Sequence, residues 1–424
     1  IVNDISRIID TNKLKISGII TDNSNSNKGA WKILKQKYPN IFFHGCVCHF
    51  LNLLVKDILS PSKISKNLRY EPDYQENFPF EDLVEFINCC SEVVSFFSNT
   101  HIFKEKLANK LQSEGKKNLV SISPTRWDSA FLMLESIMDA ESILHSIVTE
   151  MNFISGNSIE KLIKTSVFNT ITGLNFIPLM NEAMEILKPI YLWLKSFQDD
   201  NVAISCVYHA FLELQKSFQK INCNKQKKSY LLKLVKDRFD FIYGEAHGLG
   251  YILDPRYLGD EMDLTLRINI EEFLFGLHKF EPGYNQGSEN NTQYNVEKIA
   301  EEYTAWRIFA LNERDSASAR YKRLLSGKKT IIQYWESDCH SFSMLKQIAL
   351  KIFSIVPSTS KSERCFSTFE FCHSKLQNKL SSERIHKLLY IKINEKQLKS
   401  DGDQEISDCL QDNISEGFFC DSDK

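Results

Sequence analysis

The sequence predicts a mixed α/β protein that is predominantly helical. Near the start, residues 18–59 read as strand, polar turn, helix, strand and helix. From about residue 80 to residue 355, apolar residues recur every three or four positions, which is the spacing of helices that bury one face. With 424 residues, 42% hydrophobic and 25% charged, the chain has a globular composition and is long enough for two or three domains.

The composition disfavours several classes of protein. No apolar run reaches about 18 residues, so we expect no membrane-spanning segment and no membrane partner. The opening "IVNDISRIID" carries acids inside its apolar run and does not resemble a signal peptide. The eleven cysteines show no disulfide-like spacing and are expected to be reduced thiols of an intracellular protein. The net charge of −2 means that any contact with nucleic acid must come from local basic patches.

The first elements form a βαβ unit. We expect an amphipathic helix over residues 1–9, a strand over 15–21, a helix over 27–37 that Pro39 ends, and a second strand over 41–44. Two strands joined through a helix pair in parallel with a right-handed crossover. Parallel sheets need cover on both faces and usually more strands, so part of a sheet is expected to be missing.

The long middle of the chain is expected to be almost wholly helical. Its apolar stripes run through residues 83–97, 128–148, 182–197, 202–221, 231–244 and 296–311. Polar breaks fall at residues 60–77, 222–228 and 281–295, and the last of these is expected to be a mobile loop. After residue 396 the chain is acidic and poor in apolar residues, so we expect a disordered tail.

Asp22 follows the first strand and begins an Asn/Ser-rich turn. A carboxylate at the carboxyl end of a central strand is well placed to hold a divalent ion. An Asp in this position also commonly caps the turn or helix that follows. From spacing alone, both interpretations stay open.

A cluster of cysteine and histidine follows the second strand, in "HGCVCHFLN". A zinc site normally needs two separated ligand pairs, and only weak, scattered Cys/His pairs occur elsewhere in the chain. Cys46 and His49 are therefore expected to face inward at the start of a helix, where His49 could orient another group.

Two segments are candidates for contact with nucleic acid. "SPTRWDSAF" places Arg126 and Trp127 before a helix, where the Trp is either a core residue or a base-stacking aromatic beside a phosphate-binding Arg. "ARYKRLLSGKK" contains Arg320, Lys322 and Arg323, followed by two lysines. A basic run is often only a solvated face, but this one is the best phosphate-contact candidate in the chain.

Residues 356–394 carry the richest pattern. A Val-Pro break precedes a helix that begins near Ser360, and Glu363 lies three residues further on, as in a capping box. Apolar stripes at Phe366, Phe369, Leu376 and at Ile385, Leu388, Leu389 indicate two helices. They look like a helical hairpin that packs on a sheet or on a copy of itself.

The order of these segments resembles that of the hAT superfamily of DDE transposases. "TDNSNSNKGAWKIL" is similar to the family's strand-end Thr-Asp-Asn segment, and "GCVCHFLNLL" to its Cys-x-x-His helix start. "TRWDS" resembles its Arg-Trp motif, and "GYILDPRYLG" its Leu-Asp-Pro-Arg segment. "QYWE" and the later "VPSTSKSERCFSTFEFCHSKLQNKLS" resemble its C-terminal dimerisation region. These matches span roughly residues 16–394.

The resemblance implies an RNase H-like core interrupted by a large all-α insertion. It assigns residues 1–60 to a partial core and 61–335 to the insertion. Residues 336–396 would be helices that complete the core and dimerise, and 397–424 the acidic tail. Asp22 and Glu363 would be catalytic and would hold Mg²⁺ for phosphodiester cleavage and strand transfer. Cys46 and His49 would lie near them.

The resemblance also implies DNA as a partner. Arg126 and Trp127 would contact flanking DNA beside the transposon ends, with Arg320, Lys322 and Arg323 as further contacts. The chain would form a homodimer or higher oligomer through residues 345–394, and it would be nuclear.

The chain departs from the family in one respect. The family's first catalytic acid lies on a strand well before the Thr-Asp-Asn segment, whereas only residues 1–21 precede Asp22. Asp4 and Asp10 fall in or beside a helix and cannot replace it. We therefore expect an N-terminally truncated transposase that is inactive by itself and leaves an open hydrophobic sheet edge.

Three functions follow from these patterns. The first is a fragment of a hAT-type transposase, active only in a complete chain. The second is a domesticated, non-catalytic module for dimerisation and for binding DNA or protein. The third, least supported by the spacing, is a zinc-dependent regulator.

Overall fold

The computed structural model describes residues 1–59, 78–123, 128–199, 202–277 and 289–372, together with residues 384, 387, 390 and 391. The chain divides into two compact units, Ile1–Ser358 and Thr359–Lys424. As the sequence predicts, the described part is predominantly helical. None of its helices is both long and apolar enough to cross a membrane.

The first unit begins with the predicted alternation of helices and strands. The elements are α1 (Val2–Asn12), β1 (Gly18–Thr21), α2 (Asn25–Lys37), β2 (Phe42–Gly45) and α3 (Val47–Leu59). β1 and β2 pair in parallel, with Ile19 opposite Phe43 and Ile20 opposite His44. The parallel βαβ pairing predicted from the sequence is therefore confirmed, although β1 begins at Gly18 rather than at residue 15.

The two faces of this sheet pack on different partners. Ile19 and Phe43 belong to a small cluster with residues of α1 and α2. Ile20 and Phe42 face the large core of the helical body, and a Cβ at Gly18 would lie 2.9 Å from Ile355. The absence of a side chain at Gly18 lets the strand approach that core closely.

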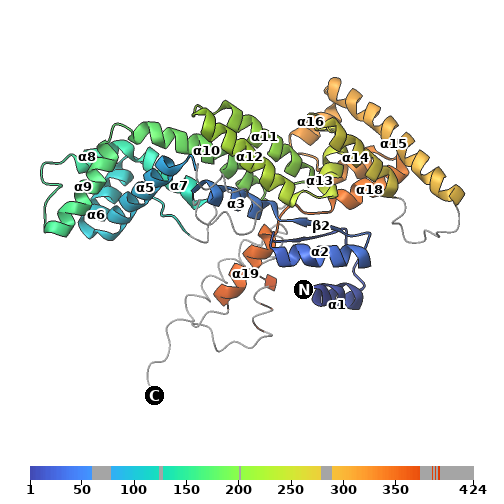
Figure 1. The fold of residues 1–424 in the computed structure, drawn as a ribbon, viewed down its shortest axis with the longest axis horizontal. Coiled ribbons are helices and arrows are strands. Elements are labelled where there is room, and N and C mark those ends of the chain that lie inside the picture. Colours follow the sequence, from blue (N-terminus) through green and yellow to red (C-terminus); the bar gives the residue numbers. More distant parts are fainter. Residues whose placement is uncertain are drawn as a thin grey trace, which may run out of the picture. The chain divides into compact units, whose positions relative to one another are not determined.

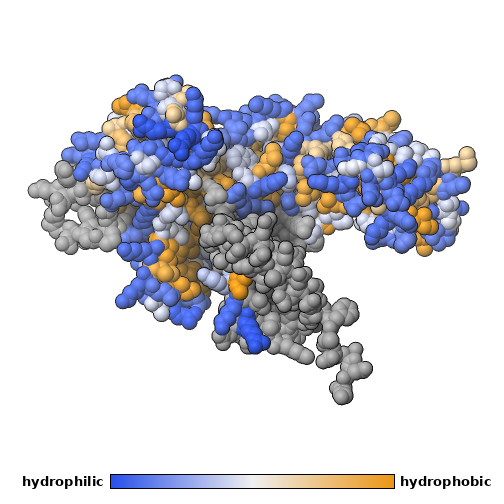
Figure 2. Space-filling view, turned by 180° about the vertical axis from the view of Figure 1, so that it is seen from behind, coloured by the Kyte–Doolittle hydropathy of each residue, from blue (hydrophilic) through white to orange (hydrophobic). Residues whose placement is uncertain are grey.

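The outer edge of β1 carries no further strand within the described residues. Ser17 and Thr21 accept hydrogen bonds from Phe42 and Cys46 of the neighbouring chain segment, at 3.0 and 2.8 Å. Because alternate residues of a parallel strand face opposite neighbours, the peptide groups of Gly18 and Ile20 are directed to the other side. Figure 2, which shows the molecule from behind, has hydrophobic residues gathered in the region of these N-terminal elements.

The rest of the first unit is a helical body. Its helices are α5 (Glu81–Asn99), α6 (His101–Ser113), α7 (Ser129–Asp139), α8 (Glu141–Val148), α9 (Ser158–Thr172), α10 (Phe176–Ser196), α11 (Ser205–Lys220), α12 (Lys225–Ile242), α13 (Glu245–Ile252), α14 (Leu264–Gly276), α15 (Glu289–Asp315), α16 (Ala319–Leu325), α17 (Ile331–Asp338) and α18 (Ser343–Phe353). Within this unit, α5–α9 gather at one end and α14–α18 at the other, with α10–α13 between them (Figure 1). One hydrophobic cluster runs through the body from Phe42 to Ile355.

Other predicted boundaries also differ from the structure. The segment 128–148 is two helices, because the chain turns at Ala140 between α7 and α8. α15 begins at Glu289, so it takes up the second half of the segment expected to be a loop.

The second unit contains α19 (Ser360–Cys372). Its start agrees with the predicted helix. Leu376 of the first predicted helix, the apolar stripe of the second (Ile385, Leu388 and Leu389) and the predicted disordered tail lie outside the described residues.

Candidate functional site

The predicted site lies where the two parallel strands end. The backbone amide of Cys46 donates to Thr21 at 2.8 Å. In return, Nδ2 of the buried Asn23 donates to the carbonyl of Cys46 at 3.3 Å. These two hydrogen bonds hold the loops after β1 and β2 side by side, so the residues that follow both strands share one edge of the sheet.

Asp22 is an exposed side chain in the turn between β1 and α2. Its Oδ1 accepts from the backbone amide of Ser24 at 2.9 Å and from Nδ2 of Asn27 at 2.7 Å. Ser24, and not Asp22, is the N-cap of α2. Asp22 thus closes the turn without capping the helix.

The charge of Asp22 is stabilised by its surroundings. Partial burial pushes the pKa of this carboxyl upward, but the hydrogen bonds from Ser24 and Asn27, together with attraction to His49, outweigh it, so the pKa is lowered. Asp22 is therefore an anion at neutral pH, as a cation ligand must be.

His49 lies in the first turn of α3 and is half-buried. Burial lowers its pKa, while attraction to Asp22 opposes that shift. The two side chains thus interact electrostatically across the sheet edge. Cys46, by contrast, is fully buried in the main core, where its thiol can pack but cannot reach solvent. The roles expected for Cys46 and His49 in a transposase stay predictions.

Glu363 belongs to the second unit and is half-buried in the first turn of α19. Its Oε1 accepts from Oγ1 of Thr359 at 2.9 Å. The sequence pattern proposes Ser360 as the cap, but Ser360 is already the first residue of the helix. The hydrogen bond to Glu363 comes instead from Thr359, the residue before it. Burial raises the pKa of Glu363, and the Thr359 hydroxyl lowers it in part.

The residues present do not by themselves fit a magnesium site. Mg²⁺ prefers several oxygen ligands in near-octahedral geometry. Within the described residues, no group of three or more His, Cys, Asp or Glu side chains is placed to hold a metal ion. This holds for Cys46, Cys48 and His49 as well, so the zinc site has no support. Asp22 is in the first unit and Glu363 in the second, and joint metal binding by these two acids stays a prediction.

The basic residues 320–323 lie on the short helix α16. Leu324 anchors this helix in the core, and Ser318 caps it. Arg320 forms an ion pair with Glu313 at 3.6 Å, whereas Lys322 and Arg323 are exposed. Contact of these two cations with a phosphate backbone stays a prediction. Arg126 and Trp127, the other predicted DNA contacts, lie outside the described residues.

A buried histidine pair was not predicted from the sequence. His44 on β2 and His247 on α13 are both fully buried, with ring centroids 4.6 Å apart. Nδ1 of His44 donates to the carbonyl of Gly45, whereas Nδ1 of His247 accepts from the amide of Gly244. These partners fix opposite tautomers, with a lone pair on Nε2 of His44 and a proton on Nε2 of His247.

Burial keeps both of these histidines neutral. It lowers the pKa of His44 to about 4, although the hydrogen bond to Gly45 opposes the shift. It also lowers the pKa of His247 well below its usual value, and His44 adds to that effect. Neither Nε2 atom has a hydrogen-bond partner in the described structure. The pair joins β2 to the helical body beneath the predicted site.

The Leu-Asp-Pro-Arg segment joins two parts of the helical body. Asp254 is fully buried, accepts from Oγ of Ser205 at 2.7 Å and pairs with the Arg256 guanidinium. It therefore ties the start of α11 to the segment after α13. A fully buried carboxylate with these partners is not exposed as a ligand.

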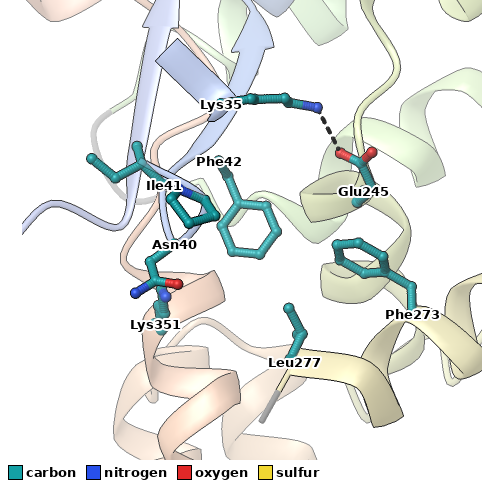
Figure 3. A pocket seen from close by; sticks show the side chains of 9 residues that line it. Lys35, Asn40, Ile41, Phe42, Glu245, Phe273, Leu277 and Lys351 are labelled. Atoms are coloured by element: carbon teal, nitrogen blue, oxygen red, sulfur yellow. Dashed lines mark hydrogen bonds and ion pairs between the residues drawn. The ribbon is translucent and has the colours of Figure 1, made fainter. Parts of the chain in front are cut away.

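A pocket of about 220 Å³ lies at the opposite end of β2. Phe42, Phe273 and Leu277 point into it, and the ion pair between Lys35 and Glu245 spans its rim at 3.3 Å (Figure 3). Pockets that bind cofactors and other small ligands are usually about 300–1,000 Å³. This pocket is smaller than that range and lies at the other end of β2, so it does not provide a cofactor site near Asp22.

Comparison with known families supports one part of the resemblance. Residues 318–394 match the hAT family C-terminal dimerisation region. The match includes α16, α17 and α18, and it supports membership of the hAT family. Arg320, Lys322 and Arg323 fall inside the matched region. No curated protein matches the chain.

Proposed function

We propose that this chain is part of a hAT-type DNA transposase or of a transposase-derived protein, and that it dimerises through its C-terminal region and binds DNA in the nucleus. The match of residues 318–394 to the family's dimerisation region carries the proposal. The parallel strands β1 and β2, with Asp22 directly after β1, support the proposed RNase H-like core, because that core contains parallel strands with an acid at a strand end.

Catalysis requires a further acid in addition to Asp22 and Glu363. In the first unit, Asp22 provides a charged carboxylate at the sheet edge, but one of its oxygens already closes the turn before α2. Cleavage and strand transfer with Mg²⁺ are thus proposed for a complete transposase and not for this chain alone.

A non-catalytic module is the second candidate. The part of the chain that the structure describes lacks a cluster of metal ligands, while the dimerisation region is matched over residues 318–394. A domesticated protein that still dimerises and binds DNA or protein would use the dimerisation region. It would not need Asp22 as a metal ligand.

Dimerisation is the property to test first. Light scattering of the purified chain is expected to give a mass of at least twice the 49.1 kDa of one chain. Leu388→Asp, on the apolar stripe of the matched region, is expected to remove one interface and lower that mass. Leu264→Asp, at an exposed leucine of α14, is the matched control and should leave the mass unchanged. A monomeric wild-type chain would contradict the proposal.

A further inference from the structure

The small pocket at the start of β2 lies where the N-terminal elements meet the helical body. One part of its lining comes from the end of α2, the loop after it and Phe42 of β2. The other part comes from Glu245 of α13, Phe273 of α14, Leu277 directly after α14, and Lys351 of α18. A group that fills this pocket therefore contacts the sheet and the body together.

The volume of the pocket suits one aromatic ring. At about 220 Å³ it is smaller than the roughly 300–1,000 Å³ of sites for cofactors and drug-sized ligands. An apolar cavity of about 150 Å³, lined by Leu, Ile and Phe, can hold benzene. The pocket thus has room for a single aromatic side chain whose main chain stays outside.

The apolar part of the lining favours such a ring. Phe42 and Phe273 supply aromatic rings, while Ile41 and Leu277 supply aliphatic side chains. Figure 3 shows Phe42, Phe273 and Leu277 directed toward one common space. Aromatic rings that meet edge-to-face or offset-stacked gain energy beyond the burial of their area. Phe42 is itself buried, so its ring is a fixed wall of the pocket.

The charged residues of the lining are mainly basic. Lys35 and Glu245 form an ion pair at 3.3 Å, with 46% and 40% of their side chains exposed. Lys351 is the second lysine, and its ammonium group lies 5.9 Å from the centroid of the Phe42 ring. Lys35 and Lys351 lie on opposite sides of that ring (Figure 3). Around Lys35, helix α2 carries four lysines and no acidic residue.

The ion pair does not exclude an acidic ligand. Exposed ion pairs stabilise a protein little, because water screens the charges and both side chains lose conformational freedom. Lys35 can therefore exchange Glu245 for a carboxylate of the ligand at small cost. A basic ligand, in contrast, would meet two lysines and only one carboxylate.

We propose that this pocket binds another protein through one aromatic side chain with acidic neighbours in its sequence. The ring lies among Phe42, Phe273 and Leu277, and the neighbouring carboxylates lie at Lys35 and Lys351. A few aromatic anchors in pockets dominate many protein–protein interfaces. A nucleobase fits less well, because its edge needs several hydrogen bonds and Asn40 is the one uncharged polar side chain among the lining residues that the structure describes.

Methyl NMR of the full chain tests the proposal, because Ile41 and Leu277 report from the lining. The peptide acetyl-Glu-Phe-Glu-amide is expected to shift both signals. Exchange of its Phe for Ala should weaken binding at least about tenfold, since the ring is the anchor. Exchange of both Glu for Gln should weaken binding about threefold for each exposed charge pair.

Substitutions in the chain separate the ring from the charges. Leu277→Trp fills the pocket and Phe273→Ala removes a wall, so both should weaken binding of every Phe peptide at least about tenfold. Lys35→Gln should weaken the Glu peptide about threefold and leave the Gln peptide unchanged. Lys32→Gln, at an exposed lysine of α2 outside the lining, is the matched control and should leave both unchanged. Unchanged circular dichroism establishes that each variant is folded.

The remaining outcomes would overturn the proposal. Equal affinities of the Phe and Ala peptides would rule out the aromatic anchor, and equal affinities of the Glu and Gln peptides would rule out an acidic partner. Displacement of the peptide by an equal concentration of a short single-stranded oligonucleotide would assign the pocket to a base. If Leu277→Trp lowers the mass of the chain in sedimentation velocity, the occupant is a second copy and not another protein.

Discussion

At the scale of single residues, Asp22 combines a structural and a chemical property. Its Oδ1 closes the turn through Ser24 and Asn27, and its charge interacts with His49. The two contributions can be separated because an amide keeps the acceptor oxygen and removes the charge. A residue retained only for the turn tolerates that exchange, whereas a metal ligand does not.

Asp22→Asn is therefore expected to change the free energy of unfolding by less than about 0.5 kcal/mol. Asp22→Ala removes both hydrogen bonds and should cost about 1 kcal/mol, as loss of a helix-terminal acceptor does. Urea unfolding measures both values. In a complete, active transposase, Asp22→Asn should abolish strand cleavage without unfolding the protein. Equal destabilisation by Asn and Ala would show that the charge, and not the acceptor, holds the turn.

The buried histidine pair makes the stability of the body depend on pH. A neutral histidine whose pKa is lowered by burial stabilises the fold above its unfolded pKa of about 6.5. That contribution is lost as the pH falls, because the unfolded chain binds the proton more readily. For His44, with a pKa of about 4, the loss between pH 6.5 and pH 4 is about 3 kcal/mol.

Urea midpoints measured from pH 7 to pH 4 test this prediction. The wild-type chain should lose stability steeply below pH 6.5. His44→Phe is expected to flatten this part of the profile, even though repacking against His247 lowers its stability at pH 7. His145→Phe, at an exposed histidine of α8, is the control and should follow the wild-type profile. A His44→Phe profile parallel to wild type would rule out the pair as the cause.

At the scale of elements, α16 is the short helix that presents the basic residues. Lys322 and Arg323 are exposed, and Arg320 is held by Glu313. If this helix binds DNA, each phosphate contact releases counterions, so the logarithm of affinity falls with the logarithm of salt concentration by about 0.9 per contact. The helix lies in the matched dimerisation region, so a dimer would present it twice.

The double variant Lys322→Gln and Arg323→Gln is therefore expected to weaken duplex binding at low salt and to reduce the salt slope by about 2 per chain. Fluorescence anisotropy with a labelled duplex gives both quantities. Lys225→Gln with Lys236→Gln, two exposed positions on α12, is the matched control of equal charge. If the two double variants behave alike, only the net charge matters and α16 is not a DNA contact.

The elements also show what local sequence could predict. The β1–α2–β2 alternation followed from apolar patterning and from Pro39, and parallel pairing followed from the helix between the strands. The two extra residues at the start of α2 depend on the Ser24 cap, and the break at Ala140 lies within an unbroken apolar stripe. Neither Gly nor Pro marks that break, so spacing alone could not find it.

Contacts between residues that are distant in the sequence could not be predicted from such local patterns. The ammonium group of Lys28 donates to the carbonyl of Phe241, and burial lowers the pKa of Lys28 to about 8. Asp57 pairs with Arg238, and His44 meets His247. Each contact depends on how the body packs against the sheet, which no local spacing records. Asp22 could be singled out because its strand and turn are local features.

At the scale of the whole first unit, stability is unevenly distributed. The helical body shares one cluster from Phe42 to Ile355. Outside the sheet, α1 and α2 pack through a cluster of only three buried residues, Ala30, Leu34 and Phe43. Regions with few buried apolar contacts open locally at a lower free energy than the core. The two-stranded sheet adds little, because β1 pairs on one side only within the described residues.

Hydrogen exchange is therefore expected to be faster in α1 and α2 than in α10 and α11 by at least about tenfold, a difference of about 1.4 kcal/mol in opening free energy. Leu34→Ala removes a fully buried side chain of the small cluster and should accelerate exchange in α1 and α2 while leaving the body protected. Leu214→Ala makes the same truncation in α11 and should instead weaken protection throughout the body. Mass spectrometry of peptides from each region measures these rates. If Leu34→Ala accelerates hydrogen exchange equally in all regions, the N-terminal elements and the body open as one cooperative unit. In that case the region around the unpaired edge of β1 is not the least stable part of the fold.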